Sequence, residues 1–208
     1  ANLSPSDAVL NRGLSLYYFK MDRLRARQKQ IINKLKVFTD KQPVNNYKPN
    51  DYASRLDVPS GVEVITIKDF NLSGDYLNIQ KPTIYIFEGT STKLSGKSAD
   101  QPMQINGPGM FIFESNVLDL SNVIFSGSIF IPIANRNLSG AINIINSNVS
   151  LSDVSIINSK AEDAINLVSS SFEIDKLSVD GSFSDAVDLD FSSGVIKKLF
   201  CMNIGNDC

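Results

Sequence analysis

Two aspartates near the end of the chain have a spacing that could support chemistry. Asp188 and Asp190 are two residues apart, so on a β-strand their side chains share one face, roughly 6–7 Å apart. Asp185 precedes them at a turn. Such carboxylates could bind Ca²⁺ or act as the acid and base of a glycoside hydrolase. They could equally cap backbone amides in turns and keep the surface polar.

The composition excludes several other kinds of site. The 208-residue chain has no His and no Trp, so a Ser-His-Asp triad, histidine metal ligands and sugar stacking on tryptophan are excluded. The two cysteines, Cys201 and Cys208, have no zinc-binding spacing. Cys201 is expected to be a buried apolar residue, and its oxidation state stays open. We therefore predict no metal site and no cofactor, with Ca²⁺ as the one ion that the aspartates could attract.

Charge divides the chain into two parts. Residues 1–40 carry eight Lys or Arg and three Asp, a net charge of +5, so the remainder carries −7. Within 4–38 apolar residues recur in alternating steps of four and three, which predicts an amphipathic α-helix with a basic outer face. This helix could pack on the domain, self-associate as a coiled coil, or contact an anionic surface. Residues 41–61 are interpreted as a linker.

The elements that would position the aspartates are repeats. Ala141-Ile142-Asn143-Ile144 is followed 23 residues later by Ala164-Ile165-Asn166-Leu167 and a further 22 residues later by Ala186-Val187-Asp188-Leu189. Within each repeat the apolar positions are two residues apart, as in a strand. The same register holds 31 residues earlier, from Phe111 to Phe125. The excess length there, Ser128–Leu138, is interpreted as an extruded loop.

Repeats of about 22 residues predict a right-handed parallel β-helix. One coil cannot bury its own apolar side, whereas coils stacked about 4.8 Å apart join equivalent side chains into continuous ladders. Right-handedness follows from the strong preference for right-handed parallel crossovers. We expect the β-helix over 62–208, with irregular first coils and regular coils from about residue 110. It is expected to continue beyond Cys208, because Asp207 and Cys208 resemble the opening of another coil.

The repeats also define a column of outward side chains. If Ile142 and Ile144 point inward, then Asn143, Asn166 and Asp188 point outward in one file. This arrangement makes Asn166, Asp185, Asp188 and Asp190 speculative ligand-binding residues. Arg136, in the extruded loop, is a further exposed candidate.

Two segments resemble repeats of the pectate-lyase-like superfamily: Lys160-Ala161-Glu162-Asp163-Ala164-Ile165-Asn166 and Phe183-Ser184-Asp185-Ala186-Val187-Asp188-Leu189-Asp190-Phe191. They look most like those of bacterial exported proteins. The resemblance covers about 62–208 and implies a secreted or cell-surface location. It implies no particular activity, because the superfamily includes lyases, hydrolases, epimerases and non-catalytic adhesins. No pectate-lyase catalytic motif is present, so no catalytic residue is carried over.

Three functions remain open. The leading hypothesis is a non-enzymatic extracellular or cell-surface scaffold or adhesion module that contacts a polysaccharide or a surface protein. The second is a polysaccharide-degrading lyase or hydrolase that uses the outer aspartates, and the third is a purely structural module of a larger protein. We expect no nucleic-acid partner. We also expect no transmembrane segment, since no run of 18 apolar residues occurs.

Overall fold

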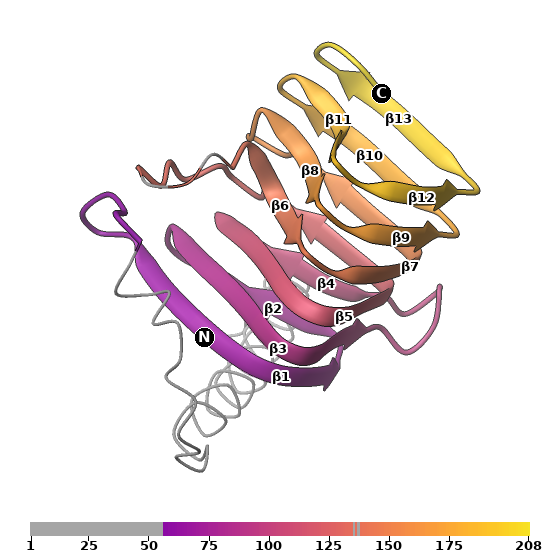
Figure 1. The fold of residues 1–208 in the computed structure, drawn as a ribbon, viewed down its shortest axis with the longest axis horizontal. Helices are drawn as coiled ribbons and strands as arrows, with labels where there is room; N and C mark the ends of the chain where they lie inside the picture. The colour runs from indigo at the N-terminus through magenta and orange to yellow at the C-terminus, as the bar shows by residue number, and fades with distance from the viewer. Residues whose placement is uncertain (1–55, 135, 137) are drawn as a thin grey trace, which may run out of the picture. The chain divides into compact units, whose positions relative to one another are not determined.

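A computed structural model of the chain describes residues 56–134, 136 and 138–208. The predicted helix at 4–38, its coiled-coil alternative and most of the linker at 41–61 lie outside these residues. The described part is a parallel β-solenoid of about six turns built from 13 strands (Figure 1). The strands are β1 (Glu63–Ser73), β2 (Tyr76–Asn78), β3 (Thr83–Ser95), β4 (Met103–Asn106), β5 (Gly109–Ser126), β6 (Gly140–Ile145), β7 (Asn148–Ile157), β8 (Asp163–Val168), β9 (Ser171–Ile174), β10 (Leu177–Ser182), β11 (Asp185–Asp190), β12 (Ser193–Ile196) and β13 (Leu199–Ile204).

The strands form three parallel faces. The first face contains the first halves of β1 and β3, the start of β5, and then β6, β8 and β11. The second face continues through the later parts of β1, β3 and β5 into β7, β9 and β12. The third face contains β2, β4, the end of β5, the end of β7, β10 and β13. Each coil therefore contributes up to three short strands, as the repeats predict.

The predicted inner ladders are confirmed. Ile142 is in register with Ile165, and Ile165 with Val187. Phe111 is in register with Ile142 across the 31-residue repeat. Ile142 and Ile165 are fully buried, whereas Val187 is only half-buried. The difference arises because no described strand lies beyond β11, so the last rung of the ladder has a neighbour on one side only.

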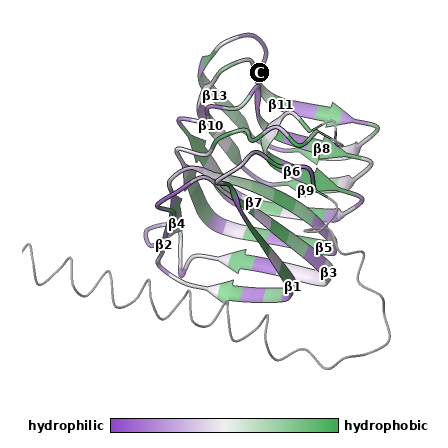
Figure 2. Cartoon of the chain, turned by 90° about the vertical axis from the view of Figure 1, so that its left-hand side faces the viewer, coloured by the Kyte–Doolittle hydropathy of each residue, from purple (hydrophilic) through white to green (hydrophobic). Residues whose placement is uncertain are grey.

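Aromatic stacking extends the inner ladder through the first coils. The ring of Phe87 stacks on Phe113 with centroids 4.8 Å apart, and Tyr85 stacks on Phe111 at 5.5 Å. Parallel in-register pairing places equivalent side chains directly above one another, so like residues meet face to face. Figure 2 shows that the strands of the solenoid contain both hydrophobic and hydrophilic stretches.

Gly194 marks a close approach between coils. It occupies the position that Phe172 holds one coil earlier. A Cβ at Gly194 would collide with the backbone carbonyl oxygen of Phe172 and with its ring, which fills the space instead. The coil can therefore stack here only because the residue lacks a side chain.

Candidate functional site

The outer column Asn143–Asn166–Asp188 exists but is not the exposed column that the sequence predicts. Asn143 pairs in register with Asn166, and Asn166 with Asp188, on the outer side of the first face. However, Asn143 is 0% and Asn166 is 2% exposed. In the earlier coils the same column contains Ile86 and Ile112, which are also buried. The lower part of this outer face is therefore a second apolar layer.

The segment predicted to be an extruded loop provides the cover for this layer. Ile131, Ile133 and Leu138 pack in one buried cluster with side chains from the outer positions of β3 and β5. The complete cluster is Leu56, Ile84, Ile86, Met110, Ile112, Ile131, Ile133 and Leu138. The start of the segment is fixed by two backbone hydrogen bonds, from Ile129 N to Gly109 O at 3.0 Å and from Lys160 N to Ser128 O at 2.9 Å. Just after its end, Asp163 N donates to Ser139 O at 3.4 Å. The segment folds back onto the solenoid and does not protrude as expected.

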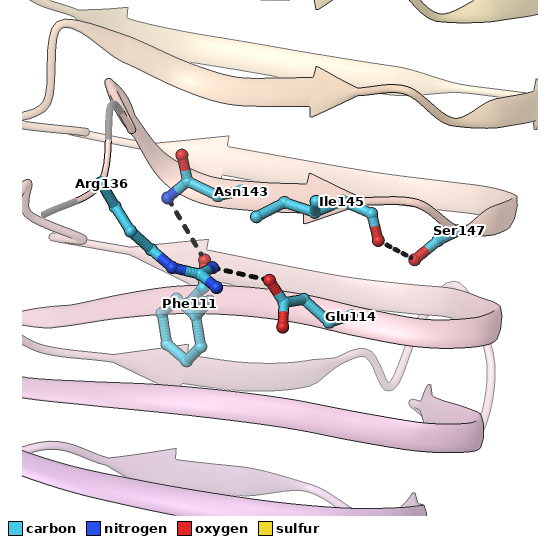
Figure 3. A network of polar contacts seen from close by, with 6 residues as sticks. All are labelled: Phe111, Glu114, Arg136, Asn143, Ile145 and Ser147. Atoms are coloured by element: carbon cyan, nitrogen blue, oxygen red, sulfur yellow. Dashed lines mark hydrogen bonds and ion pairs between the residues drawn. The ribbon is translucent and has the colours of Figure 1, made fainter. Parts of the chain in front are cut away.

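Arg136 is not the exposed ligand-binding candidate that the sequence suggests. Its guanidinium Nη1 donates to Glu114 Oε1 at 2.6 Å, and its side chain is 23% exposed (Figure 3). Glu114 lies on β5, and its own side chain is 11% exposed. The ion pair fastens the covering segment to the first face.

The two asparagines make different sets of hydrogen bonds. Asn143 Nδ2 donates to Phe111 O at 3.5 Å (Figure 3) and to Gly140 O at 2.7 Å, and its Oδ1 accepts from Gly140 N at 3.1 Å. Asn166 Nδ2 donates to Ser139 Oγ at 2.9 Å, but its buried Oδ1 has no partner. Both polar atoms of the Asn143 side chain therefore have hydrogen-bond partners, whereas the side-chain oxygen of Asn166 does not.

Asp185, Asp188 and Asp190 lie along β11, which pairs with β8, and their environments differ. The Asp185 carboxylate accepts hydrogen bonds from Asp207 N at 3.1 Å and Asn206 Nδ2 at 3.0 Å. These bonds lower the pKa of Asp185, the Asp207 amide making the larger contribution. Asp185 therefore caps a turn, as the structural interpretation of the sequence allowed. Burial and the charge of Asp190 raise the pKa of Asp188.

Asp163 belongs to the same group, and sequence reasoning missed it as a site residue. It is 3% exposed, and its pKa is raised, first by burial and further by the charges of Asp188 and neighbouring acids. Its place in the repeat, immediately before Ala164, was visible in the sequence. Its hydrogen bond to Ser139, which follows the non-repeating covering segment, was not. Within the described ranges, no three His, Cys, Asp or Glu side chains are grouped to hold a metal ion. We therefore derive no chemistry from Ca²⁺ here.

Asp163 should give the protein a measurable pH dependence. Its pKa is raised in the folded state, so the folded protein binds this proton more tightly than the unfolded chain. The stabilisation is complete at low pH and is lost as the pH rises through the raised pKa. We expect wild-type stability, relative to Asp163→Asn, to increase as the pH falls from 7 towards 4. Urea unfolding of both proteins across this range tests the prediction, and a constant difference would contradict it.

The last coil carries large apolar side chains where earlier coils carry polar ones. Phe200 stands above Ser178, Met202 above Asp180, and Val195 above Glu173. Phe200 is 52% exposed and Met202 is 59% exposed. Phe191 is 93% exposed and has a φ of 52°, in the turn position where the coils below place Ser169 and Asn146. Six of the eight large exposed apolar side chains of the described residues lie in 183–202, spread over β11, β12, β13 and the adjoining turns. This concentration was not recognised from the sequence.

Cys201 is half-buried and disulfide-bonded, so its prediction as a buried apolar residue is wrong. It pairs in register with the buried Val179, as the repeats require. However, its sulfur bonds to Cys208 seven residues later, with Cα atoms 6.0 Å apart. No described coil lies beyond β13, so this inner position is open enough for the bond to form.

The disulfide should stabilise the final coil. Closing a loop of this length lowers the conformational entropy of the unfolded chain, which stabilises the folded state by about 2.5 kcal/mol. Replacing both Cys201 and Cys208 by serine is expected to lower the unfolding free energy by about that amount. Chemical denaturation with and without reductant measures the effect. The reductant should destabilise the wild type and leave the double variant unchanged.

No described residue belongs to a helix long and apolar enough to cross a bilayer. No family model matches the chain, and neither a curated protein nor a solved structure is detectably similar to it. The parallel solenoid is thus established by the strand register alone, and the resemblance to the pectate-lyase-like superfamily stays a prediction.

Proposed function

We propose that this protein is a non-catalytic, secreted or cell-surface β-solenoid scaffold that binds a protein partner through its last coil. The observation that carries the proposal is the concentration of exposed apolar side chains in residues 183–202 of the last coil. Large exposed apolar side chains that gather on one part of a protein, rather than lying scattered, mark interaction sites. Aromatic residues and methionine are enriched at such interfaces.

The conformation of Phe191 adds to this support. A bulky residue with positive φ is uncommon, because its Cβ crowds the backbone. The equivalent turns of the preceding coils have Asn146 and Ser169. A positive φ is less unfavourable for these small polar residues than for phenylalanine. Placing a phenylalanine there, almost fully in solvent, lowers stability without any compensating contact within the described residues. A contact with a partner would provide that compensation.

The proposed location is supported by the Cys201–Cys208 disulfide. Such bonds persist in oxidising compartments and are rare in the cytosol. A polysaccharide partner fits the last coil less well, because its exposed side chains are apolar and the chain has no tryptophan.

The experiment compares two matched variants of the immobilised protein. Phe200→Ser with Met202→Ser removes exposed apolar side chains from the last coil. Val117→Ser with Phe130→Ser removes exposed apolar side chains elsewhere, since these residues are 47% and 36% exposed. From cell-envelope extracts of the source organism, the wild type and the second variant should retain the same protein, and the first variant should lose it. Equal retention by all three would overturn the proposal.

One observation favours the enzymatic alternative enough to test it. Asp188 has a raised pKa, which suits a general acid, and Asp190 follows it on the same side of β11 at roughly 6–7 Å. However, the charged groups that act on Asp188 among the described residues are further acids, Asp190 and Asp185. Depolymerisation assays on uronic and neutral glycans should show no cleavage. Cleavage that Asp188→Asn abolishes would establish the enzyme instead.

A further inference from the structure

Four asparagines of the chain stand in a sequence that can accept a glycan. Asn2, Asn71, Asn137 and Asn148 each begin an Asn-X-Ser sequence, the acceptor for N-linked glycosylation in exported proteins. Asn2 and Asn137 lie outside the described residues. A chain rich in asparagine and serine produces such sequences by chance, so the surroundings of Asn71 and Asn148 must distinguish between them.

Asn148 is the first residue of β7, and its side chain points outward on the second face. Asn148 and Ser150 are exposed, whereas Val149 between them is 3% exposed. Both polar side chains of the acceptor sequence therefore lie on the same outer face. Strands lie on both sides of this position, because Asn148 pairs in register with Val117 of β5 and with Ser171 of β9. The exposure of Asn148 is thus a property of the interior of the stack.

The Asn148 amide has room for a large group. Its Oδ1 accepts a hydrogen bond from Ser171 Oγ at 3.4 Å. Among the described residues Nδ2, the atom that glycosylation modifies, has no hydrogen-bond partner. The two side chains in register with Asn148 are short and uncharged. One of them, Val117, is 47% exposed and offers an apolar contact to the ring of a sugar attached to Nδ2.

Asn71 meets the same sequence requirement, but its surroundings differ. It is exposed on β1 and pairs in register with Lys93 of β3. The Lys93 ammonium forms an ion pair with Asp119 at 2.6 Å. A sugar on Asn71 would lie beside this ion pair and would have no apolar side chain in register on β3. The surroundings therefore favour Asn148.

We propose that Asn148 of the exported protein carries an N-linked glycan whose first sugar, an N-acetylated amino sugar, packs on Val117. This inference rests on the exported location in the proposed function and not on the partner of the last coil. The co-reactant is an oligosaccharide linked to a polyprenyl pyrophosphate. Asn148 Nδ2 forms a bond to the anomeric carbon of this donor and loses one proton. The bond from that carbon to the pyrophosphate oxygen breaks, and the pyrophosphate leaves with its electron pair.

The test measures intact masses of the protein exported by its source organism and of four variants. The wild type and Ser150→Thr keep the acceptor sequence and should be heavier than the polypeptide by whole sugar residues. Asn148→Gln and Ser150→Ala should lose this extra mass. The matched control, Asn116→Gln, changes an exposed asparagine of β5 that begins no acceptor sequence and should keep it. Fragmentation of the glycopeptide should locate the sugar at position 148.

Thermal unfolding tests the contact with Val117. Enzymatic removal of the glycan from the wild type should lower the unfolding midpoint by about 2 °C, the shift that a small loss of stability produces in a chain of this size. In Val117→Ser the shift should be smaller, because the apolar contact is absent. Equal shifts in the two proteins would show that the sugar does not pack on Val117 and would overturn this part of the proposal.

An exported protein whose mass equals that of the polypeptide, or a glycan on Asn71 with none on Asn148, would overturn the glycosylation of Asn148. The proposed function would stand in either case if the last coil still retains its envelope protein. Recovery of the chain from the cytosol alone would overturn the exported location, and both proposals with it.

Discussion

Replacing Phe113 by alanine is expected to lower the unfolding free energy by about 3–5 kcal/mol. Phe113 is 0% exposed, stacks on Phe87, and is in register with Ile144 on the following coil. Its removal leaves a cavity between two coils that cannot close without shifting the strands. Each coil of a solenoid is stabilised by contacts with its neighbours, so the loss weakens the stack on both sides.

The matched control is Phe200→Ala, which removes the same ring from the exposed side of the last coil. Phe200 is 52% exposed, and substitutions at such positions usually change stability by at most about 0.5 kcal/mol. Urea unfolding of the three proteins, followed by circular dichroism, measures both effects. If the two variants lose equal stability, Phe113 is not in the core that the strand register defines.

The inner ladders could be predicted from the sequence because they repeat their own residue types. Each inner side chain packs on its counterpart one coil away. A constant spacing, such as that from Ile142 to Ile165, therefore identifies which residues are in contact. The 31-residue step from Phe111 to Ile142 could be included because an insertion between strands leaves the register within the strands unchanged.

The outer layer could not be predicted in this way, because its cover occurs once and has no repeat. One signal was present: Ile84, Tyr85, Ile86 and Phe87 are consecutive apolar residues, and all four are buried. Such a run indicates a strand covered on both faces. It does not identify which segment provides the cover, so Asn143, Asn166 and Arg136 were expected to be exposed.

The candidate site at the end of the solenoid was predicted only in part. The repeats aligned Asp188 with Asn166 correctly. They could not show that Asp163 is buried, that Asp185 caps a turn, or that Cys201 forms a disulfide. These properties depend on the residues that surround the last coils. The spacing of the repeats does not identify those residues.

A substitution in the covering segment should also lower the stability of the protein strongly. Ile131→Asp is expected to lower the unfolding free energy by about 3–5 kcal/mol, because it places an unpaired carboxylate within a closed apolar cluster. Ile131 is 3% exposed and packs with Ile86 and Ile112. Phe130→Asp is the control. Phe130 is the adjacent residue and is 36% exposed, so the same charge there stays in water and should change little.

Loosening the segment should also alter the acids at its far end. The hydroxyl of Ser139, immediately after the cover, hydrogen-bonds to Asp163, and burial is the main reason that the pKa of Asp163 is raised. If Ile131→Asp detaches the cover while the inner ladders persist, the Asp163 carboxylate becomes hydrated and its pKa falls towards the ordinary value. The pH dependence that distinguishes the wild type from Asp163→Asn should then shrink in the Ile131→Asp background. An undiminished pH dependence would mean that β8 and β11 bury Asp163 without help from the cover.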